Sequence, residues 1–276
     1  MPSTLSQYLT QRQRLINEAL NRYLPKGSAY PPSIHRAVRY SVMSSGKRIR
    51  PVLALAACEA VGGDPRRALA AACAIEMIHT YSLIHDDLPS IDNDDYRRGR
   101  PSCHKRFGEA LAVLAGDALL TRSFELLAQA NGHSAAVHLT AIREIAAAAG
   151  TSGMIGGQVV DIEPVRGRQT PQRLRYINAH KTGALIAVSV KTGALLGGAT
   201  PLQYRRLSRF GERIGLVFQI VDDVLDGDGV AKLLGVARAG AQARRLTQQA
   251  VRELAPLGVR AERLRQLASL IATRTA

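Results

Sequence analysis

The chain of 276 residues is long enough for one large domain or two of ordinary size. Hydrophobic residues make up 46% of it and aromatic residues 4%, and this composition favours a large helical core over a sheet. The formal net charge is +15, but the arginines are spread along the chain without a zinc-finger spacing, an RNA-binding aromatic motif or an uninterrupted basic arm, so we expect no nucleic-acid partner.

The cysteines and the apolar pattern predict the compartment. Cys58, Cys73 and Cys103 are odd in number and form no C-x-x-C pair, which favours a reducing, cytoplasmic location. The first 20 residues contain no apolar core of signal-peptide length, and no apolar run approaches the roughly 20 residues of a membrane span. We therefore expect a soluble protein without stable membrane insertion.

Prolines predict the helix starts in chain order. The first helical residues are expected at Pro51, Pro65, Pro171 and Pro201, with Asp64, Thr170 and Thr200 as N-caps of the last three. Residues 102–163 contain no proline and are expected to form two or more helices separated by glycine-containing turns. No linker or repeat divides the chain, so we predict a single all-α domain over residues 1–276.

Two predicted helices end in clustered carboxylates. Asp86 and Asp87 close one, because Pro89 disfavours helix at the residue before it, and Asp92 follows in the loop. The helix from Pro201 ends in Asp222, Asp223 and Asp226 and stops at Gly227. A carboxylate near a helix C-terminus is disfavoured by roughly 0.3–1 kcal/mol. Each run could be a solvated loop, but two such clusters indicate a hard cation such as Mg²⁺.

Basic groups show the opposite anomaly. Lys47, Arg48 and Arg50 stand at the positive end of the helix opened by Pro51, where cations are disfavoured unless an anion binds among them. Arg97 with Arg98, and Lys181 with Thr182, offer further phosphate ligands. Each basic group alone could be a surface charge, but together with the acidic clusters they indicate a metal-bridged diphosphate.

These motifs resemble those of bacterial farnesyl and geranylgeranyl diphosphate synthases. "DDLPSID" and "DDVLD" look like the two aspartate-rich motifs, and "GKRIRP", "EMIHTYSLIHDD", "RRGRPSCHKRFGEALAVLAGDALL", "GGQVVDI", "HKTGAL" and "FQIVDD" match in type and order over about residues 30–228. The resemblance implies an isoprenoid synthase-type helical bundle around a deep central cavity, usually a homodimer. It also implies Mg²⁺-dependent, head-to-tail condensation of isopentenyl diphosphate with an allylic diphosphate.

The resemblance further implies roles for the motif residues. Mg²⁺ would be bound by Asp86, Asp87, Asp92, Asp222, Asp223 and Asp226. Isopentenyl diphosphate would be bound by Gly46, Lys47, Arg50, His79 and Arg98. The allylic diphosphate would be bound by Arg97, Lys181, Thr182 and Gln219, which with Asp86, Asp92 and Asp222 form the catalytic set. His79 could instead be a core histidine, Gln158 and Asp161 could be helix-packing polar residues, and His85 is expected only to orient the first motif.

The residue five before the first motif predicts product length. Tyr81, with Ser82 beside it, would lie about one helical turn deeper along the cavity wall than Asp86. Relatives with an aromatic residue there typically stop at farnesyl, so farnesyl diphosphate is the expected main product, with geranylgeranyl diphosphate as the alternative. Two other possibilities are a non-catalytic subunit of a heteromeric synthase and an enzyme that cyclises one allylic diphosphate.

The chain departs from the family pattern after the second motif. We expect the family's lysine-containing loop to be deleted between Asp226 and the next helix, and Lys232, the only later lysine, falls at an expected helix-packing position. We therefore expect Arg97 and Lys181 to carry more of the allylic binding. The eight arginines of residues 230–276 could simply coat solvated helix faces.

Overall fold

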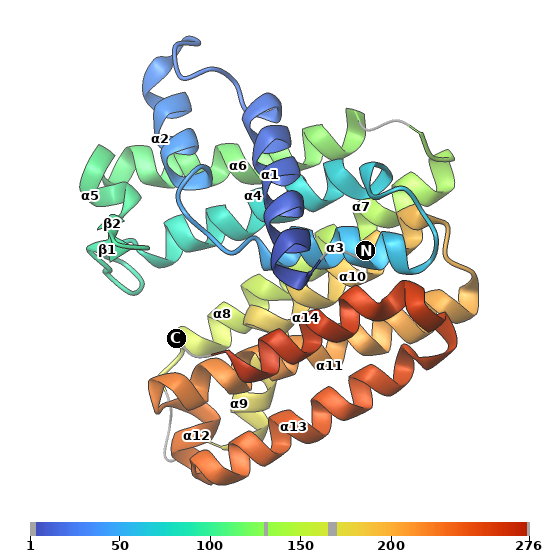
Figure 1. Ribbon diagram of the computed structural model, residues 1–276. Helices are drawn as coiled ribbons and strands as arrows, with labels where there is room; N and C mark the ends of the chain where they lie inside the picture. The colour runs from blue at the N-terminus through green and yellow to red at the C-terminus, as the bar shows by residue number, and fades with distance from the viewer. Residues whose placement is uncertain (1–3, 130–131, 165–169, 275–276) are drawn as a thin grey trace. The chain divides into compact units, whose positions relative to one another are not determined.

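The computed structural model describes residues 4–129, 132–164 and 170–274. These residues are predominantly helical, which confirms the predicted all-α class (Figure 1). The chain forms two compact units, the first from Met1–Val52 and Leu69–Gly132 and the second from Leu53–Ala68 and His133–Ala276. The single-domain organisation stays a prediction.

The first unit is built around one helix that is buried on nearly every side. Its elements are α1 (Leu5–Tyr23), α2 (Pro32–Val42), the start of α3 (Ile49–Ala60), α4 (Leu69–Asp86), β1 (Tyr96–Arg97), β2 (Arg100–Pro101), α5 (Cys103–Phe107) and α6 (Glu109–Gln129). Helix α4 packs against α1, α2 and α6. Gly116 allows α6 to come close, because a Cβ there would lie 2.0 Å from the His85 ring.

The second unit has α10 and α11 at its centre. Its elements are the rest of α3, η1 (Pro65–Ala68), α7 (Ala135–Ala149), α8 (Met154–Ile162), α9 (Pro171–Ile177), η2 (Asn178–Gly183), α10 (Ala184–Gly197), α11 (Pro201–Asp226), α12 (Gly229–Leu234), α13 (Val236–Glu253), η3 (Ala255–Ala261) and α14 (Glu262–Thr273). Helix α10 is apolar around its circumference and packs against α7 and α11, while α13 and α14 cover other parts of α11 (Figure 1).

The proline-based helix starts are mostly confirmed. Thr200 caps α11 with a reciprocal capping box, and Thr170 caps α9. After Asp64 the first turn is a 3₁₀ turn rather than α-helix. The predicted start at Pro51 is wrong by two residues, because the first α-turn closes from the Val52 amide onto the carbonyl of Arg48.

A second correction concerns the helix expected from Pro171 onward. It is interrupted by η2, one turn of π-helix that contains His180, Lys181 and Thr182. Glycines account for the interruption, because a Cβ at Gly157 of α8 would lie 2.1 Å from the Lys181 amide nitrogen and one at Gly215 of α11 would lie 2.8 Å from Gly183. Two neighbouring helices thus press their backbones against this turn, and π-turns are frequent at functional sites.

The expectation that no segment reaches the length of a membrane span also needs correction. The helix over Pro65–Asp86 is long and apolar enough by length and composition. However, 72% of its most apolar window is buried inside the protein, as in the core helix of a folded unit. Its apolar character is thus explained by the position of α4 at the centre of the first unit.

Candidate active site

The first aspartate motif folds into a turn that brings its ends together. Helix α4 ends at Asp86, and the amide of Asp92 donates to the Asp86 carbonyl at 2.9 Å. The six-residue spacing therefore places Asp92 next to Asp86 in space, with Asn93 in the left-handed region at φ 55°. Asp92 is exposed and Asp86 is half-buried, so these carboxylates are accessible.

Asp87, in contrast, is buried and already paired. Its Oδ1 accepts from Nε of Arg97 at 2.8 Å and from Nη2 of the same guanidinium, which also contacts Asp94. Burial raises the pKa of Asp87 above its ordinary value, although the hydrogen bond and charge of Arg97 act against that rise. The geometry therefore suits Asp87 to holding Arg97 rather than to binding metal directly.

A short hairpin directs the neighbouring arginines to different places. Strands β1 and β2 pair antiparallel, and their turn places Arg98 and Gly99 at φ 54° and 74°, as a type I′ turn requires. Arg97 contacts the aspartate motif, whereas Nη1 of Arg98 donates to the Ser44 hydroxyl at 3.3 Å. This separation matches the two roles that the resemblance assigns. The sequence analysis did not predict this hairpin. Its one local sign is the Arg98-Gly99 pair at the turn.

Arg98 faces the loop between α2 and α3. A Cβ at Gly46 would lie 2.7 Å from Nη1 of Arg98, so glycine is needed for this approach. Lys47 in the same loop is exposed and Arg50 is half-buried. Burial, followed by the charges of Arg50 and Arg98, holds the pKa of His79 well below its ordinary value. The residues predicted to bind isopentenyl diphosphate therefore form one cationic group in the first unit.

Tyr81 lies in α4 one turn before the aspartates. It is 5% exposed, its ring meets that of His85 edge-on at 5.7 Å, and its hydroxyl bonds to no group in the described part of the chain. Burial and the nearby charge of Asp86 raise the pKa of Tyr81 to about 12. Ser82 instead donates its hydroxyl to the carbonyl of His79 at 3.0 Å.

The second aspartate motif divides its carboxylates in the same way as the first. Asp226 is exposed and Asp222 is half-buried, with burial raising the pKa of Asp222 against the effect of Arg274. Asp223 is buried and accepts from Asn178, Gln219 and the amide of Val230 at 3.2, 2.9 and 2.9 Å. Asp223 thus fixes the start of α12 and the Gln219 side chain.

The π-turn and α11 present the remaining predicted residues together. The Thr182 hydroxyl donates to Oε1 of Gln219 at 2.6 Å, and Nζ of Lys181 donates to Asp161 at 2.6 Å. Gln158 has no hydrogen-bond partner for either buried amide atom among the described residues. Gln158 and Asp161 were both considered as helix-packing residues, and the hydrogen bond to Lys181 connects Asp161 to the predicted site residues.

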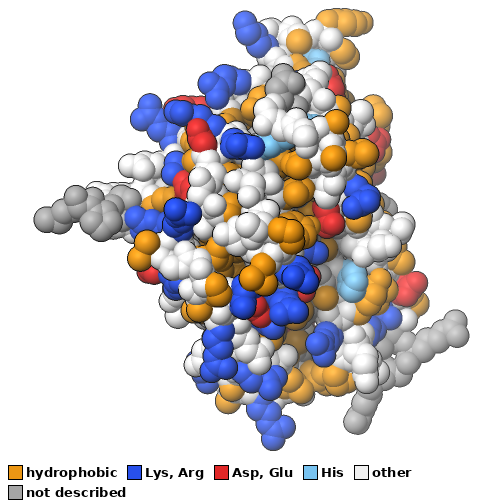
Figure 2. Space-filling model, turned by 90° about the vertical axis from the view of Figure 1, so that its right-hand side faces the viewer, with side chains coloured by type: hydrophobic (Ala, Val, Ile, Leu, Met, Phe, Trp, Pro, Cys, Tyr) orange, Lys and Arg blue, Asp and Glu red, His pale blue; other side chains and the backbone are white. Residues whose placement is uncertain are grey.

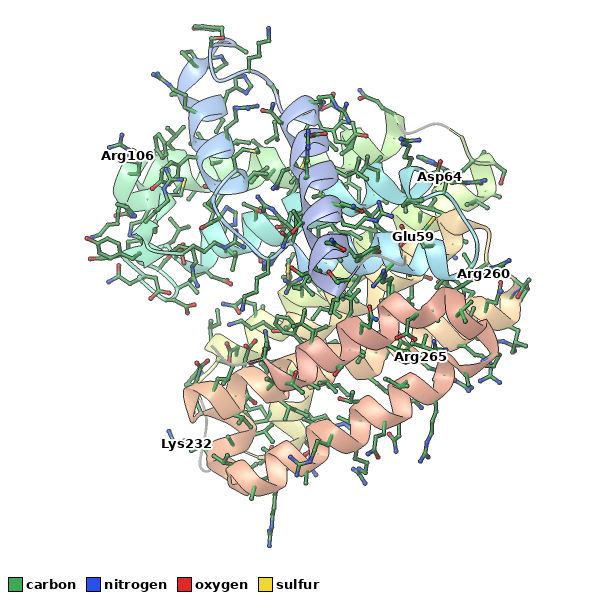
Figure 3. All side chains as sticks on the ribbon, in the orientation of Figure 1. Glu59, Asp64, Arg106, Lys232, Arg260 and Arg265 are labelled. Atoms are coloured by element: carbon green, nitrogen blue, oxygen red, sulfur yellow. The ribbon has the colours of Figure 1, made fainter. Side chains whose placement is uncertain are left out.

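A cavity of about 920 Å³ lies in the second unit, and residues of the π-turn, α11 and α12 line it. Its polar lining consists of Asp161, Asn178, Lys181, Thr182, Gln219, Asp223, Asp226, Asp228 and Lys232. The prediction that Lys232 occupies a helix-packing position is wrong, because its side chain is 79% exposed and extends from the short helix α12 at 3.7 Å from Asp228 (Figure 3). As expected, α12 begins only three residues after Asp226.

Arg274 was not predicted to have a role. Its Nη2 lies 2.7 Å from Oδ1 of Asp222 and donates to the Phe218 carbonyl at 2.5 Å, and its guanidinium lies 3.7 Å from the Phe218 ring centroid. One of the tail arginines expected to coat a helix face therefore neutralises a motif aspartate. Its position 56 residues after Phe218 gave no local indication of this contact.

The donor chemistry of the accessible aspartates fits Mg²⁺. Asp86, Asp92, Asp222 and Asp226 offer only oxygen, and Mg²⁺ is typically held by a few carboxylates together with water and substrate phosphates. Within the described ranges, no three acidic, His or Cys side chains form a ready-made metal cage. Binding at either motif would therefore depend on water and substrate oxygens as well as protein ligands.

Several known proteins are similar to this chain in sequence or in fold. A family model described as polyprenyl synthetase matches residues 31–241. Farnesyl diphosphate synthase of Geobacillus stearothermophilus is 47% identical over 84% of this chain and 78% of the relative. Geranylgeranyl diphosphate synthase of Cyanophora paradoxa is 47% identical over 83% and 76%. The apo structure of an FPP/GFPP synthase from Zymomonas mobilis has a TM-score of 0.92 at 37% identity, covering 98% of this chain and 100% of that chain.

Proposed function

Because the chain belongs to the polyprenyl synthetase family and is a trans-prenyltransferase, we propose that it condenses isopentenyl diphosphate with dimethylallyl and geranyl diphosphates to give mainly farnesyl diphosphate. Each of the two aspartate motifs has accessible carboxylates and one buried carboxylate that is hydrogen-bonded to neighbouring groups. This repeated arrangement is the observation that supports the proposal. A non-catalytic subunit would not require both motifs to be intact.

Asp86, Asp92, Asp222 and Asp226 are the proposed ligands of Mg²⁺. Bound there, Mg²⁺ would supply positive charge that stabilises the diphosphate leaving group. Asp87 and Asp223, which the sequence analysis also placed among the metal ligands, are instead proposed to position Arg97 and Gln219.

Ionisation of the allylic substrate places its new negative charge among cationic side chains. From the match of their motifs to the family, Arg97 of the first unit and Lys181 of the second are the proposed ligands of the departing diphosphate. Lys232, which is exposed on α12 and lines the same cavity as Lys181, is a further proposed ligand. The Thr182 hydroxyl oxygen and the backbone carbonyl of Gln219 present their negative dipole ends to the allylic cation. The C–O bond electrons leave with diphosphate, the double bond of isopentenyl diphosphate forms the new C–C bond, and the released diphosphate takes the proton.

The second diphosphate is bound by the cationic group of the first unit. Gly46, Lys47, Arg50, His79 and Arg98 are its proposed ligands. Burial, Arg50 and Arg98 hold the pKa of His79 well below its ordinary value before a diphosphate binds, and we propose that the imidazole hydrogen-bonds the diphosphate. An enzyme that only cyclises one allylic diphosphate would have no use for this second group.

We extend the proposal to the setting of the enzyme. All three cysteines are buried and free, in keeping with a reducing cytoplasm. Val113 and Leu114 are exposed on α6, and a homodimer would cover such apolar side chains. On the face shown in Figure 2, Lys and Arg side chains are spread among acidic and apolar ones, which suits small anionic substrates better than a nucleic acid.

Product analysis tests the proposal. Labelled isopentenyl diphosphate is incubated with each allylic primer, with and without Mg²⁺, and the chain length of the product is measured. We expect mainly farnesyl diphosphate, abolished by chelation, and a loss of kcat of at least a hundredfold in Asp86→Ala and Asp222→Ala with unchanged helical content. Undiminished turnover in either variant would contradict the metal assignment, and a C20 product would favour geranylgeranyl diphosphate synthesis.

A further inference from the structure

Arg48 lies between two proposed diphosphate ligands but, unlike the exposed Lys47, is buried. Its side chain is 2% exposed, and Nη1 lies 2.7 Å from Oε1 of Glu76 in α4, which is also 2% exposed. Burying an ion pair costs desolvation that its attraction often fails to offset. Stability alone therefore gives little reason for this pair.

The other donors of Arg48 hold the loop that carries Lys47. Nη2 donates to the carbonyls of Val42 and Ser44 at 2.6 and 3.1 Å, so the guanidinium closes the loop between α2 and α3 upon itself. Nε donates to the Asn17 side chain of α1 at 3.1 Å. The backbone of Arg48 is in the left-handed region at φ 51°, a conformation that a non-glycine residue keeps only when its surroundings fix it.

The loop held in this way meets Arg98. The Ser44 hydroxyl accepts from Arg98, and Gly46 lies close against the same guanidinium. From α1, Nε2 of Gln13 donates to the Lys47 carbonyl at 3.0 Å. Arg48 thus links the position of Lys47 to that of Arg98 without being exposed itself.

We propose that Arg48, held by Glu76, is a positioning residue for isopentenyl diphosphate, an inference that rests on the proposed function. It fixes the spacing of the Lys47 loop and Arg98 so that both reach one diphosphate. Its removal lets the loop relax, which weakens isopentenyl diphosphate binding and leaves the allylic site unchanged. Since Arg48 is also a cation near His79, position must be separated from charge.

Arg48→Lys and Arg48→Met make this separation in the full chain. Lysine keeps the charge but cannot make the four hydrogen bonds of the guanidinium. We expect both variants, and Glu76→Gln, to raise the KM for isopentenyl diphosphate about tenfold or more, with kcat and the allylic KM within twofold of wild type. A wild-type KM in Arg48→Lys would show that charge alone acts, and equal losses in kcat and both KM values would show a general structural role; either result overturns the proposal.

Variants on α1 keep the test decisive if Arg48 variants fail to fold. Asn17→Ala and Gln13→Ala each remove one bond to the loop and should raise the same KM about three- to tenfold. Arg14→Ala is the matched control, because on the same helix it breaks, among the residues that the structure describes, only an exposed pair with Glu18. Unchanged KM values in both α1 variants would overturn the proposal.

Calorimetric binding of isopentenyl diphosphate to the wild type separates the two proposals. A wild type that neither binds it nor turns it over contradicts the proposed function itself. A wild type that does both, with variants that bind equally tightly, contradicts only the role of Arg48.

Discussion

His79 is kept neutral by its surroundings, and this has a consequence for stability against pH. The pKa of His79 is held well below its ordinary value by burial and then by Arg50 and Arg98. In the unfolded chain the imidazole has its ordinary pKa of about 6.5. As the pH falls below that value, the unfolded state binds a proton that the native state does not, so stability is lost by up to about 1.4 kcal/mol per pH unit.

Replacing His79 should remove this loss. Urea unfolding at pH 7.5 and 5.5 should show the wild type losing about 1 kcal/mol more than His79→Gln between the two values. Carboxylates titrate in both proteins, so their contribution to the pH dependence of stability cancels in the comparison. Equal pH dependence would mean that the pKa of His79 in the native state is close to its ordinary value.

Tyr81 provides a residue-scale test of product length. Its buried ring lies one turn before Asp86, so Tyr81→Ala should open space for a longer chain and shift the products beyond farnesyl. Loss of a buried aromatic ring costs about 3–5 kcal/mol, so products are measured below the lowered Tm. Tyr81→Phe is the control, because the hydroxyl it removes has no partner among the described groups, and its products should match the wild type. Unchanged lengths in Tyr81→Ala would mean that another side chain limits the length of the product.

At the scale of elements, the π-turn η2 depends on close helix packing. Gly215→Ala would place a Cβ 2.8 Å from Gly183, an overpacking that costs about 1–3 kcal/mol. Because Lys181 and Thr182 lie in this turn, we expect a rise in the allylic KM of tenfold or more together with a Tm lower by several degrees.

A second helix glycine offers the matched control for that change. Gly240 in α13 has space for a Cβ, whose nearest contact is the flexible end of Arg244 at 3.5 Å. Gly240→Ala should therefore leave the KM unchanged and raise stability by about 0.5–1 kcal/mol. An unaltered allylic KM in Gly215→Ala would show that the π-turn does not position Lys181.

The whole molecule shows which kinds of structure a sequence can predict. Helix starts at Thr170 and Thr200 and the stop at Gly227 were predictable because caps and turns depend on adjacent residues. The accessible aspartates were predictable because their charge opposes the helix dipole locally. The π-turn and the partners of Arg48 and Arg274 were not, because they depend on close packing and on contacts between residues far apart in the chain.

The pairing of Arg274 with Asp222 implies that the proposed Mg²⁺ binding at Asp222 would be an exchange and not a simple addition. The guanidinium already neutralises the carboxylate, so an ion binding there would have to displace it before sharing that oxygen. Arg274→Ala should therefore shift the Mg²⁺ titration, followed calorimetrically without substrate, towards tighter binding by roughly threefold or more. Arg263→Ala, on α14, the helix that Arg274 follows, serves as the comparison and should leave the isotherm unchanged. Identical isotherms for wild type and Arg274→Ala would mean that the last turns of the chain hold α11 in place without competing for its ion.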